Sequence, residues 1–280
     1  MWKICLRISG HYTNPNTDTT FNKTNKTSKI MKARFFFTPI VLLAALCIPF
    51  TGCTEMANKF AEGLAKEALD FEYEDSAKWG TVTEQELSFP AFNSIKTKGK
   101  VRIVLSGDST SSVRVRTNKK CLEAYKYAVK KDELRIECKD FKGQVNRNTP
   151  PVTFFIAVPS LKDLEFTGAG KLDVVGTMVQ EEPLEIEING AGEVNIDTLA
   201  VASLNVELNG VADCSFAHVT AQGDIEIEVN GAGDINANVF CQELEVELNG
   251  ASNAVLSGEC KNFVCDENGA SKVDSSNLKR

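Results

Sequence analysis

Residues 186–196 read IEINGAGEVNI, and this short stretch decides how the chain folds. Apolar and polar residues alternate on both sides of a central Asn-Gly-Ala-Gly, which is the period-two pattern of a β-strand with one buried face. Five further copies of the pattern follow or precede it. The first glycines of the six copies lie 22, 20, 21, 19 and 19 residues apart, at Gly168, Gly190, Gly210, Gly231, Gly250 and Gly269.

The repeat length predicts the architecture. A fixed period near twenty residues is typical of a chain that winds, because each coil buries its apolar face on the next. The positions four before, two before and four after the glycine are apolar in nearly every copy. Glu267 breaks this pattern in the last copy, as expected of a frayed terminal coil. The sequence therefore predicts an all-β solenoid of about twenty-residue coils, with a less regular N-terminal β part.

The residues around each glycine predict how the chain turns. Glycine supplies backbone dihedral angles that a Cβ atom would forbid. The next residue is alanine in five copies and Val211 in the sixth, which predicts a column of small residues at a corner. Asparagine precedes the glycine in five copies and suits a ladder of amide hydrogen bonds along the stack. These asparagines are Asn189, Asn209, Asn230, Asn249 and Asn268.

Composition divides the chain into parts. Residues 80–158 alternate as short strands and are predicted to form the N-terminal β part, or cap, before the repeat coils of residues 159–280. Within this part, residues 101–107 (VRIVLSG) have the same phase relative to Gly107 as the later repeats have to their glycines. This phase predicts that the winding begins there. The segment 139–151, which ends in two prolines, is the clearest break before the regular coils.

The N-terminal 52 residues have the features of an export signal. Lys32 and Arg34 precede an apolar run that is too short to span a membrane, and the run ends at Gly52-Cys53. The junction resembles a bacterial lipobox, which implies that Cys53 is acylated and becomes the first mature residue. The alternative is an ordinary secretory signal in which Cys53 is incidental. Residues 1–52 are thus predicted to be a signal peptide, with residues 1–30 an over-extended start.

Residues 53–79 are predicted to be a lipidated tether that contains a short helix, because apolar residues recur there four apart. Such a tether would hold the β part away from a bilayer and attach the chain to the membrane through Cys53.

The charge is distributed unevenly. Residues 161–280 carry six basic and 22 acidic side chains, a net charge of −16, whereas residues 53–160 carry 18 basic and 15 acidic side chains, a net charge of +3. Phosphate groups need cationic neutralisation, so this balance argues against nucleic acid as a partner of the repeats.

One acidic column lies three residues before each glycine: Glu165, Glu187, Glu207, Glu228, Glu247 and Asp266. In register, successive carboxylates would be ~4.8 Å apart. Facing like charges cost a few tenths to about 1 kcal/mol per pair. Three interpretations are open: water and salt screen the column, Ca²⁺ binds to Glu187, Glu207, Glu228 and Glu247, or a basic partner docks there, including the chain's own segment 96–147.

Two cysteines are predicted to stack. Cys241 and Cys260 each follow their repeat's first glycine by ten residues, so they should lie on adjacent coils. Their spacing permits a disulfide, but parallel Cβ directions make its geometry poor, and a pair of buried thiols is an equal alternative.

No catalytic constellation emerges from the sequence. His218 has no recognisable serine or aspartate partner, and carboxylates recur at every coil, whereas a catalytic pair should be singular. Neither tryptophan nor tyrosine occurs beyond Tyr127 to stack on sugars. The sequence therefore favours a protein that is not an enzyme and needs no cofactor other than the Ca²⁺ considered above. A carbohydrate-active enzyme, a polysaccharide lyase or glycosidase, is the alternative.

The repeated Thr/Asn-Gly-Ala/Val-Gly/Ala/Ser corner, preceded by FFIAVPSLKDLEF at residues 154–166, resembles the putative auto-transporter adhesin, head GIN domain family of bacterial envelope proteins. The resemblance covers roughly residues 88–275 and implies a right-handed parallel β-helix without an established activity. Together with Cys53, it leads us to expect a lipid-anchored binding or structural protein of the cell envelope, in the outer membrane. Its acidic face would meet an envelope protein or a glycan.

Overall fold

The computed structural model describes residues 69–71, 73, 75–143, 145 and 148–280, which all belong to one compact unit, Thr38–Arg280. The predicted export signal, Cys53 and the tether helix lie outside the described residues. No helix in the described part is long and apolar enough to cross a membrane.

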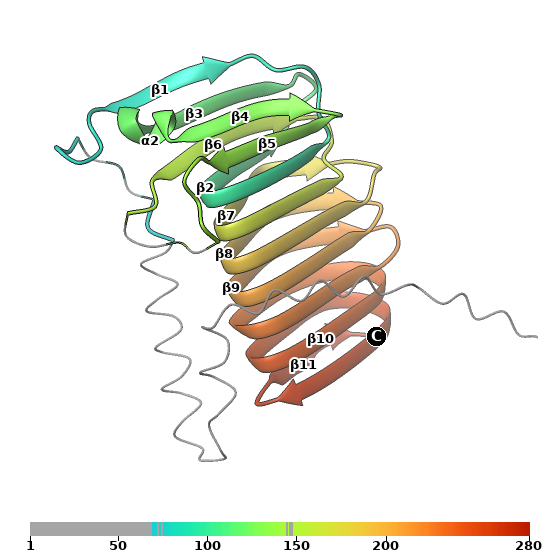
Figure 1. Ribbon diagram of the computed structural model, residues 1–280. Coiled ribbons are helices and arrows are strands. Elements are labelled where there is room, and N and C mark those ends of the chain that lie inside the picture. The colour runs from blue at the N-terminus through green and yellow to red at the C-terminus, as the bar shows by residue number, and fades with distance from the viewer. Residues whose placement is uncertain (1–68, 72, 74, 144, 146–147) are drawn as a thin grey trace, which may run out of the picture. The chain divides into compact units, whose positions relative to one another are not determined.

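The described chain is nearly all β-structure, as predicted, and forms one large sheet in which most strand pairs are parallel (Figure 1). One short helix interrupts the strands. In chain order the elements are β1 (Val82–Leu87), β2 (Ser94–Gly107), β3 (Ser112–Asn118), α2 (Lys119–Glu123), β4 (Tyr125–Lys130), β5 (Glu133–Cys138), β6 (Pro151–Val158), β7 (Asp163–Val179), β8 (Leu184–Val201), β9 (Leu204–Ala221), β10 (Ile225–Gly269) and β11 (Lys272–Lys279).

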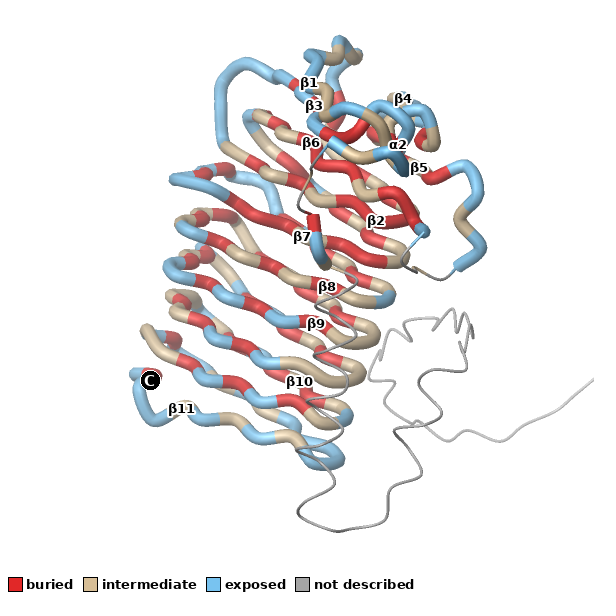
Figure 2. The backbone as a smooth tube through the Cα atoms, turned by 90° about the vertical axis from the view of Figure 1, so that its left-hand side faces the viewer, coloured by how far each residue is buried: buried red, intermediate tan, exposed pale blue. Residues whose placement is uncertain are grey.

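Successive repeats pair in parallel and in register. Gly168 of β7 lies beside Gly190 of β8, and Gly210 of β9 lies between Gly190 and Gly231 of β10. The repeat spacing read from the sequence is therefore the spacing of paired strands. Inward residues that are buried and outward residues that are more exposed alternate along the repeat strands, and the pattern recurs from β8 to β9 (Figure 2).

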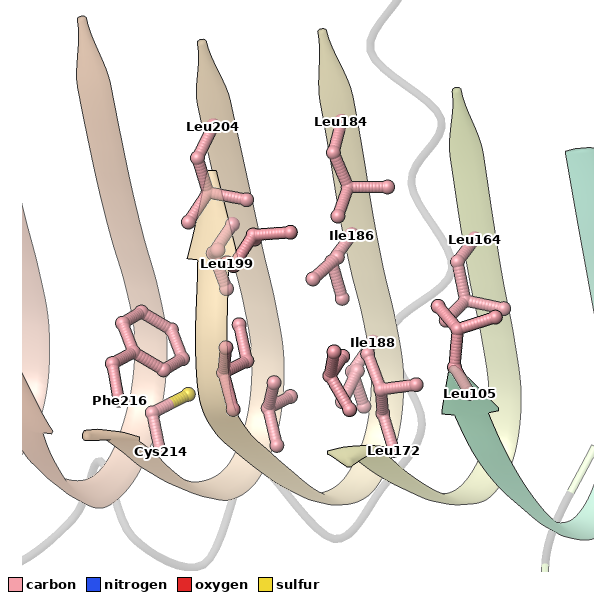
Figure 3. Close-up of a cluster of buried hydrophobic side chains, with 14 of the residues drawn as sticks. Leu105, Leu164, Leu172, Leu184, Ile186, Ile188, Leu199, Leu204, Cys214 and Phe216 are labelled. Carbon is pink, nitrogen blue, oxygen red and sulfur yellow. The ribbon is translucent and has the colours of Figure 1, made fainter. Parts of the chain in front are cut away.

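The apolar columns form the core. Ile188, Leu208 and Val229, two residues before their glycines, are at most 1% exposed. Figure 3 shows Leu164, Ile186 and Phe216 among the side chains that fill the interior. Full burial of such a side chain contributes about 1.5–3 kcal/mol, so the stacked columns dominate stability. A column six residues after the glycine is buried as well and was not assigned from the sequence: Val174, Ile196, Phe216, Ala237 and Leu256.

The glycine column has the predicted role, and the small-residue column is displaced by one position. Gly190 has a φ of +138°, and a Cβ atom there would lie 2.1 Å from the carbonyl oxygen of Gly168. Ala191, at the position predicted to be tight, is partly exposed. The tight position is Gly192, where a Cβ atom would lie 2.6 Å from Cγ2 of Ile188, because the backbone turns this residue inward.

The parallel stack of glycine-containing strands begins in β2, but around Gly99 and not around Gly107 as predicted. Gly99 pairs with Gly168 of β7, whereas Gly107 pairs with Val158 of β6. The two glycines of β2 are eight residues apart, an even number, so a period-two pattern has the same phase relative to either one. Strand pairing alone distinguishes them.

The N-terminal part departs from the parallel order. The first half of β2 pairs with β5 and its second half with β6, both in parallel. β4 and β3 then add antiparallel to β5 and β6, and β1 adds antiparallel to β3. In the structure, the cap consists of β1, β3, β4, β5 and β6 together with α2. Sequence patterning did not predict α2 or β4, and it placed the first strand at residues 87–92 instead of at β1.

The last residues of the predicted tether pack on the fold. Phe71 is 7% exposed, and the Tyr73 hydroxyl is 2.9 Å from Oγ1 of Thr153 in β6. The contact with β6 therefore starts before residue 80, where the β part was predicted to begin.

Candidate functional site

The outward residues before the glycines form an ordered surface of carboxylates and amides. We call it the Glu/Asn face. It consists of the column Glu165, Glu187, Glu207, Glu228 and Glu247 and the asparagines Asn189, Asn209, Asn230, Asn249 and Asn268.

Three asparagines of the Glu/Asn face, Asn209, Asn230 and Asn249, each donate hydrogen bonds to two neighbours. Nδ2 of Asn209 donates to Oε1 of Glu207 at 2.7 Å and to Oδ1 of Asn189, on the preceding coil, at 3.1 Å. Asn230 and Asn249 repeat both contacts, and Asn268 extends the ladder to Asn249. The predicted amide ladder is therefore present. Sequence reasoning missed its link to the carboxylates, although the Glu-x-Asn spacing on one strand face signals it.

The asparagines lessen the cost of stacking carboxylates. Burial is the largest influence on the Glu187 carboxyl and raises its pKa, and the neighbouring Glu165 and Glu207 raise it further. The hydrogen bond from Asn189 acts in the opposite direction and favours the ionised form. The column thus consists of partly buried carboxylates that are held in place by amides.

The chain's own basic segment neutralises the cap end of this surface. Lys96 of β2 pairs with Glu165. A separate ion pair lies outside the Glu/Asn face, after the glycines, between Lys171 of β7 and Glu193 of β8 at 2.7 Å. The chain's own segment 96–147 was one of the basic partners considered for the acidic column, and it contacts the first residue of that column, Glu165. In the part of the chain that the structure describes, no ion pair reaches the later members Glu187, Glu207, Glu228 and Glu247.

The predicted cation site does not form a cluster. Within the described ranges, no group of three or more His, Cys, Asp or Glu side chains could hold a metal ion. Glu187, Glu207, Glu228 and Glu247 are spread along the stack, one per coil, and each bonds its own asparagine. Ca²⁺ prefers six to eight converging oxygens, and this column offers no such convergence.

A shallow groove of about 550 Å³ lies on the strands that follow the glycines. Asp213 and Asp234 are among the residues that line it. The backbone N–H of Asp234 donates to Oδ1 of Asp213 at 2.9 Å, and Asn253 Nδ2 donates to Oδ1 of Asp234 at 3.0 Å. We call this site the polar groove; its lining residues are Glu193, Asn195, Asp213, Cys214, Ser215, Asp234, Ile235, Asn236, Asn253 and Val255.

The polar groove offers more acceptors than donors. Burial raises the pKa of Asp213, and the charges of Asp234 and Glu193 add to this effect. In both Asp213 and Asp234, the second carboxylate oxygen can accept a hydrogen bond from a ligand. These groups can accept hydrogen bonds from hydroxyl or ammonium groups of a ligand. Sequence analysis did not single them out, because acidic and amide residues three and five after the glycine resemble an ordinary solvated strand face.

The paired cysteines are free thiols. Cys241 and Cys260 form no disulfide, and burial together with the neighbouring Cys260 raises the pKa of the Cys241 thiol to about 11. Cys260 is buried but Cys241 is only partly buried, so the two thiols do not form the fully buried pair that was predicted.

His218 is not part of a catalytic arrangement in the described residues. It is exposed, and its ring lies 5.0 Å from that of Phe240. No hydrogen bond joins it to a serine or a carboxylate within the described part of the chain.

Comparison with solved structures finds the same fold in bacterial proteins. A putative adhesin from Bacteroides fragilis is 19% identical, with a TM-score of 0.52, over 69% of this chain and 96% of its own. A putative adhesin from Parabacteroides distasonis is 16% identical, with a TM-score of 0.52, over 70% of this chain and 98% of its own. At these identities the likeness shows the fold alone. No curated protein matches the chain significantly.

A family model provides the assignment. The model described as putative auto-transporter adhesin, head GIN domain, matches residues 91–218 and 208–280. These ranges include the glycine column, the Glu/Asn face and the polar groove. The resemblance noted in the sequence is therefore confirmed, and the chain belongs to the putative auto-transporter adhesin, head GIN domain family.

Proposed function

We propose that this chain is a lipid-anchored adhesin of the bacterial cell envelope, in the outer membrane, whose acid- and amide-rich surface binds a glycan or an envelope protein. Family membership and the adhesin-like neighbours support an adhesin-like role at the cell surface or envelope. The observation that carries the proposal is the polar groove, where Asp213 and Asp234 have no basic partner among the described side chains.

The proposal includes a right-handed parallel β-helix as the scaffold. In-register parallel pairing of repeats about twenty residues apart supports it, because such pairing requires the chain to return to the same side after each repeat. A scaffold of this kind is stiff and displays identical columns along its length, which suits a binding surface.

The anchor is proposed at Cys53, on the strength of the lipobox resemblance. Cys53→Ala should abolish incorporation of labelled palmitate and leave the protein uncleaved or soluble. A mutant that still incorporates the label would exclude Cys53 as the acylation site.

The proposed role involves no catalysis, but the polar groove favours one alternative. Asp213 and Asp234 lie on neighbouring strands, and the raised pKa of Asp213 is the property that a general acid needs. A polysaccharide lyase or glycosidase acting through this pair is therefore the second candidate. Release of reducing sugars from a panel of polysaccharides, lost in Asp213→Asn, would favour the enzyme over the adhesin.

Binding of the purified chain to a glycan array and to isolated envelope proteins tests the adhesin proposal. Asp213→Lys/Asp234→Lys should remove binding. The matched control, Glu243→Lys/Glu259→Lys, makes the same change of charge outside the groove and should bind as the wild type does. Equal loss in both variants would show that net charge, and not the groove, determines binding.

A further inference from the structure

The cap carries a row of exposed lysines that neither surface described above uses. They lie on α2, on β4 and in the turn after β4, and we call them the basic edge: Lys119, Lys120, Lys126, Lys130 and Lys131. Among the described strands β4 pairs only with β5, and Figure 1 shows this edge at the end of the sheet opposite β11.

The basic edge has an excess of positive charge. Residues 119–132 contain five lysines against Glu123 and Asp132, a net charge of +3. None of the five lysines has an ion pair within the described part of the chain. The wider segment 94–142 holds 14 basic and 6 acidic side chains, a net charge of +8, whereas the coils of residues 161–280 have −16. The two ends of the stack are therefore opposite in charge.

The basic edge also contacts the segment that leads back to the proposed anchor. The backbone N–H of Lys119 donates to Thr81 at 2.9 Å, and that of Lys120 donates to Trp79 at 3.1 Å. Leu69, where the described chain begins, is 16 residues after Cys53. A fully extended chain of that length spans at most about 55 Å. Acylation at Cys53 would thus keep the basic edge within reach of the bilayer, at most about 55 Å away along the tether.

We propose that the basic edge docks on anionic lipid headgroups of the membrane that anchors the chain, so that the acidic coils point away from it. The inference rests on the anchor proposed above. Lysines are attracted to anionic lipid within a Debye length of about 8 Å, and carboxylates are repelled. Trp79, which is partly exposed beside α2 with Lys78 Nζ 4.4 Å from its ring centre, is of the residue type enriched at membrane interfaces.

Vesicle sedimentation of the full chain with Cys53→Ser tests the edge without an acyl chain. The leader, residues 1–52, is apolar and basic and contributes equally to vesicle binding in all variants, so the contribution of the basic edge is measured as the difference between variants. Vesicles that contain phosphatidylglycerol should bind about tenfold more tightly than vesicles of phosphatidylcholine alone at low ionic strength. That gain should disappear at about 0.5 M salt, where screening shortens the Debye length to a few ångströms.

Two triple variants locate the effect. Lys119→Glu/Lys126→Glu/Lys130→Glu should lose much of the gain from phosphatidylglycerol, and the part that remains is due to the basic leader. Lys261→Glu/Lys272→Glu/Lys279→Glu makes the same change of charge at the far end, on exposed residues, and should retain it. If the first variant has a lower melting temperature than the parent chain, glutamine replaces the three lysines instead. These glutamine substitutions should remove part of the gain in binding from phosphatidylglycerol.

Two results would overturn the inference: equal binding to both vesicle types by the parent chain, or equal loss in the two triple variants. The anchor proposal is tested separately. It fails if the chain that retains Cys53 does not incorporate labelled palmitate.

Discussion

Arg102 of β2 and Asp173 of β7 link the first two strands of the parallel stack. Nε of Arg102 donates to Oδ2 of Asp173 at 2.7 Å, and Asn195 of β8 donates to Oδ1 of the same carboxylate at 2.9 Å. Asp173 is 9% exposed, so hydrogen bonds from these two donors must replace the water contacts that its carboxylate loses. One carboxylate thus connects three consecutive strands of the stack.

Removing the arginine should destabilise the fold. Arg102→Met leaves Asp173 with one donor, and we expect a loss of about 1–2 kcal/mol of unfolding free energy in urea, because a charged hydrogen bond is lost at a largely buried site. Arg102→Met/Asp173→Leu should recover part of the loss, since no unpaired charge remains. A double variant less stable than the sum of its single variants would contradict this account.

The glycine column should not tolerate a methyl group. Gly190→Ala places a Cβ atom against the Gly168 carbonyl at a φ that L-residues rarely adopt, and we expect a loss of at least about 2 kcal/mol. The neighbouring Ala191→Gly is the control and should cost no more than about 1 kcal/mol. Thermal melting measures both; similar shifts would mean that the register is not set by these contacts.

The two faces of one strand should respond differently to charge. Ile188→Asp buries an unpaired carboxylate at a fully buried position, and we expect a loss of several kcal/mol. Glu187→Gln, one residue away, should stay within about 0.5 kcal/mol or stabilise the fold, because the raised pKa of Glu187 reflects a cost of its charge. Equal sensitivity in circular dichroism melts would contradict the inward and outward assignment.

The acidic surface should make stability depend on pH. Burial, followed by the charges of Glu185 and Glu165, raises the pKa of Asp163 from its usual 3.8 to about 6. The folded state therefore retains a proton that the unfolded state releases, and stability falls as the pH rises from about 4 to about 6. Asp163→Asn should reduce this dependence and stabilise the protein at pH 7. Identical profiles for the variant and the wild type, from urea titrations at pH 4.5 and pH 7, would contradict it.

Much of this fold can be predicted from the sequence, because local patterns encode it. Alternation around residues such as Ile188 identifies the inward columns, since a β-strand turns successive side chains to opposite faces. The Gly190 and Asn189 columns follow from repetition, because equivalent residues of an in-register stack must meet. The same repetition identifies the Glu column, and with it one half of the Glu/Asn face.

Only the tertiary structure decided the remaining features, because they depend on pairs far apart in the sequence. Pairing with β7 decides whether Gly99 or Gly107 joins the glycine column. A period-two sequence pattern is the same for both glycines and cannot distinguish them. The tight position at Gly192 depends on how the corner rotates the backbone toward Ile188. The polar groove and the basic edge could not be predicted either. Their charged residues have the same sequence pattern as other solvent-exposed residues, and only the pairing of distant strands shows which of them are neighbours. The sequence by itself therefore determined the repeat and its inward face, whereas the placement of distant strands decided which outward residues gather into surfaces.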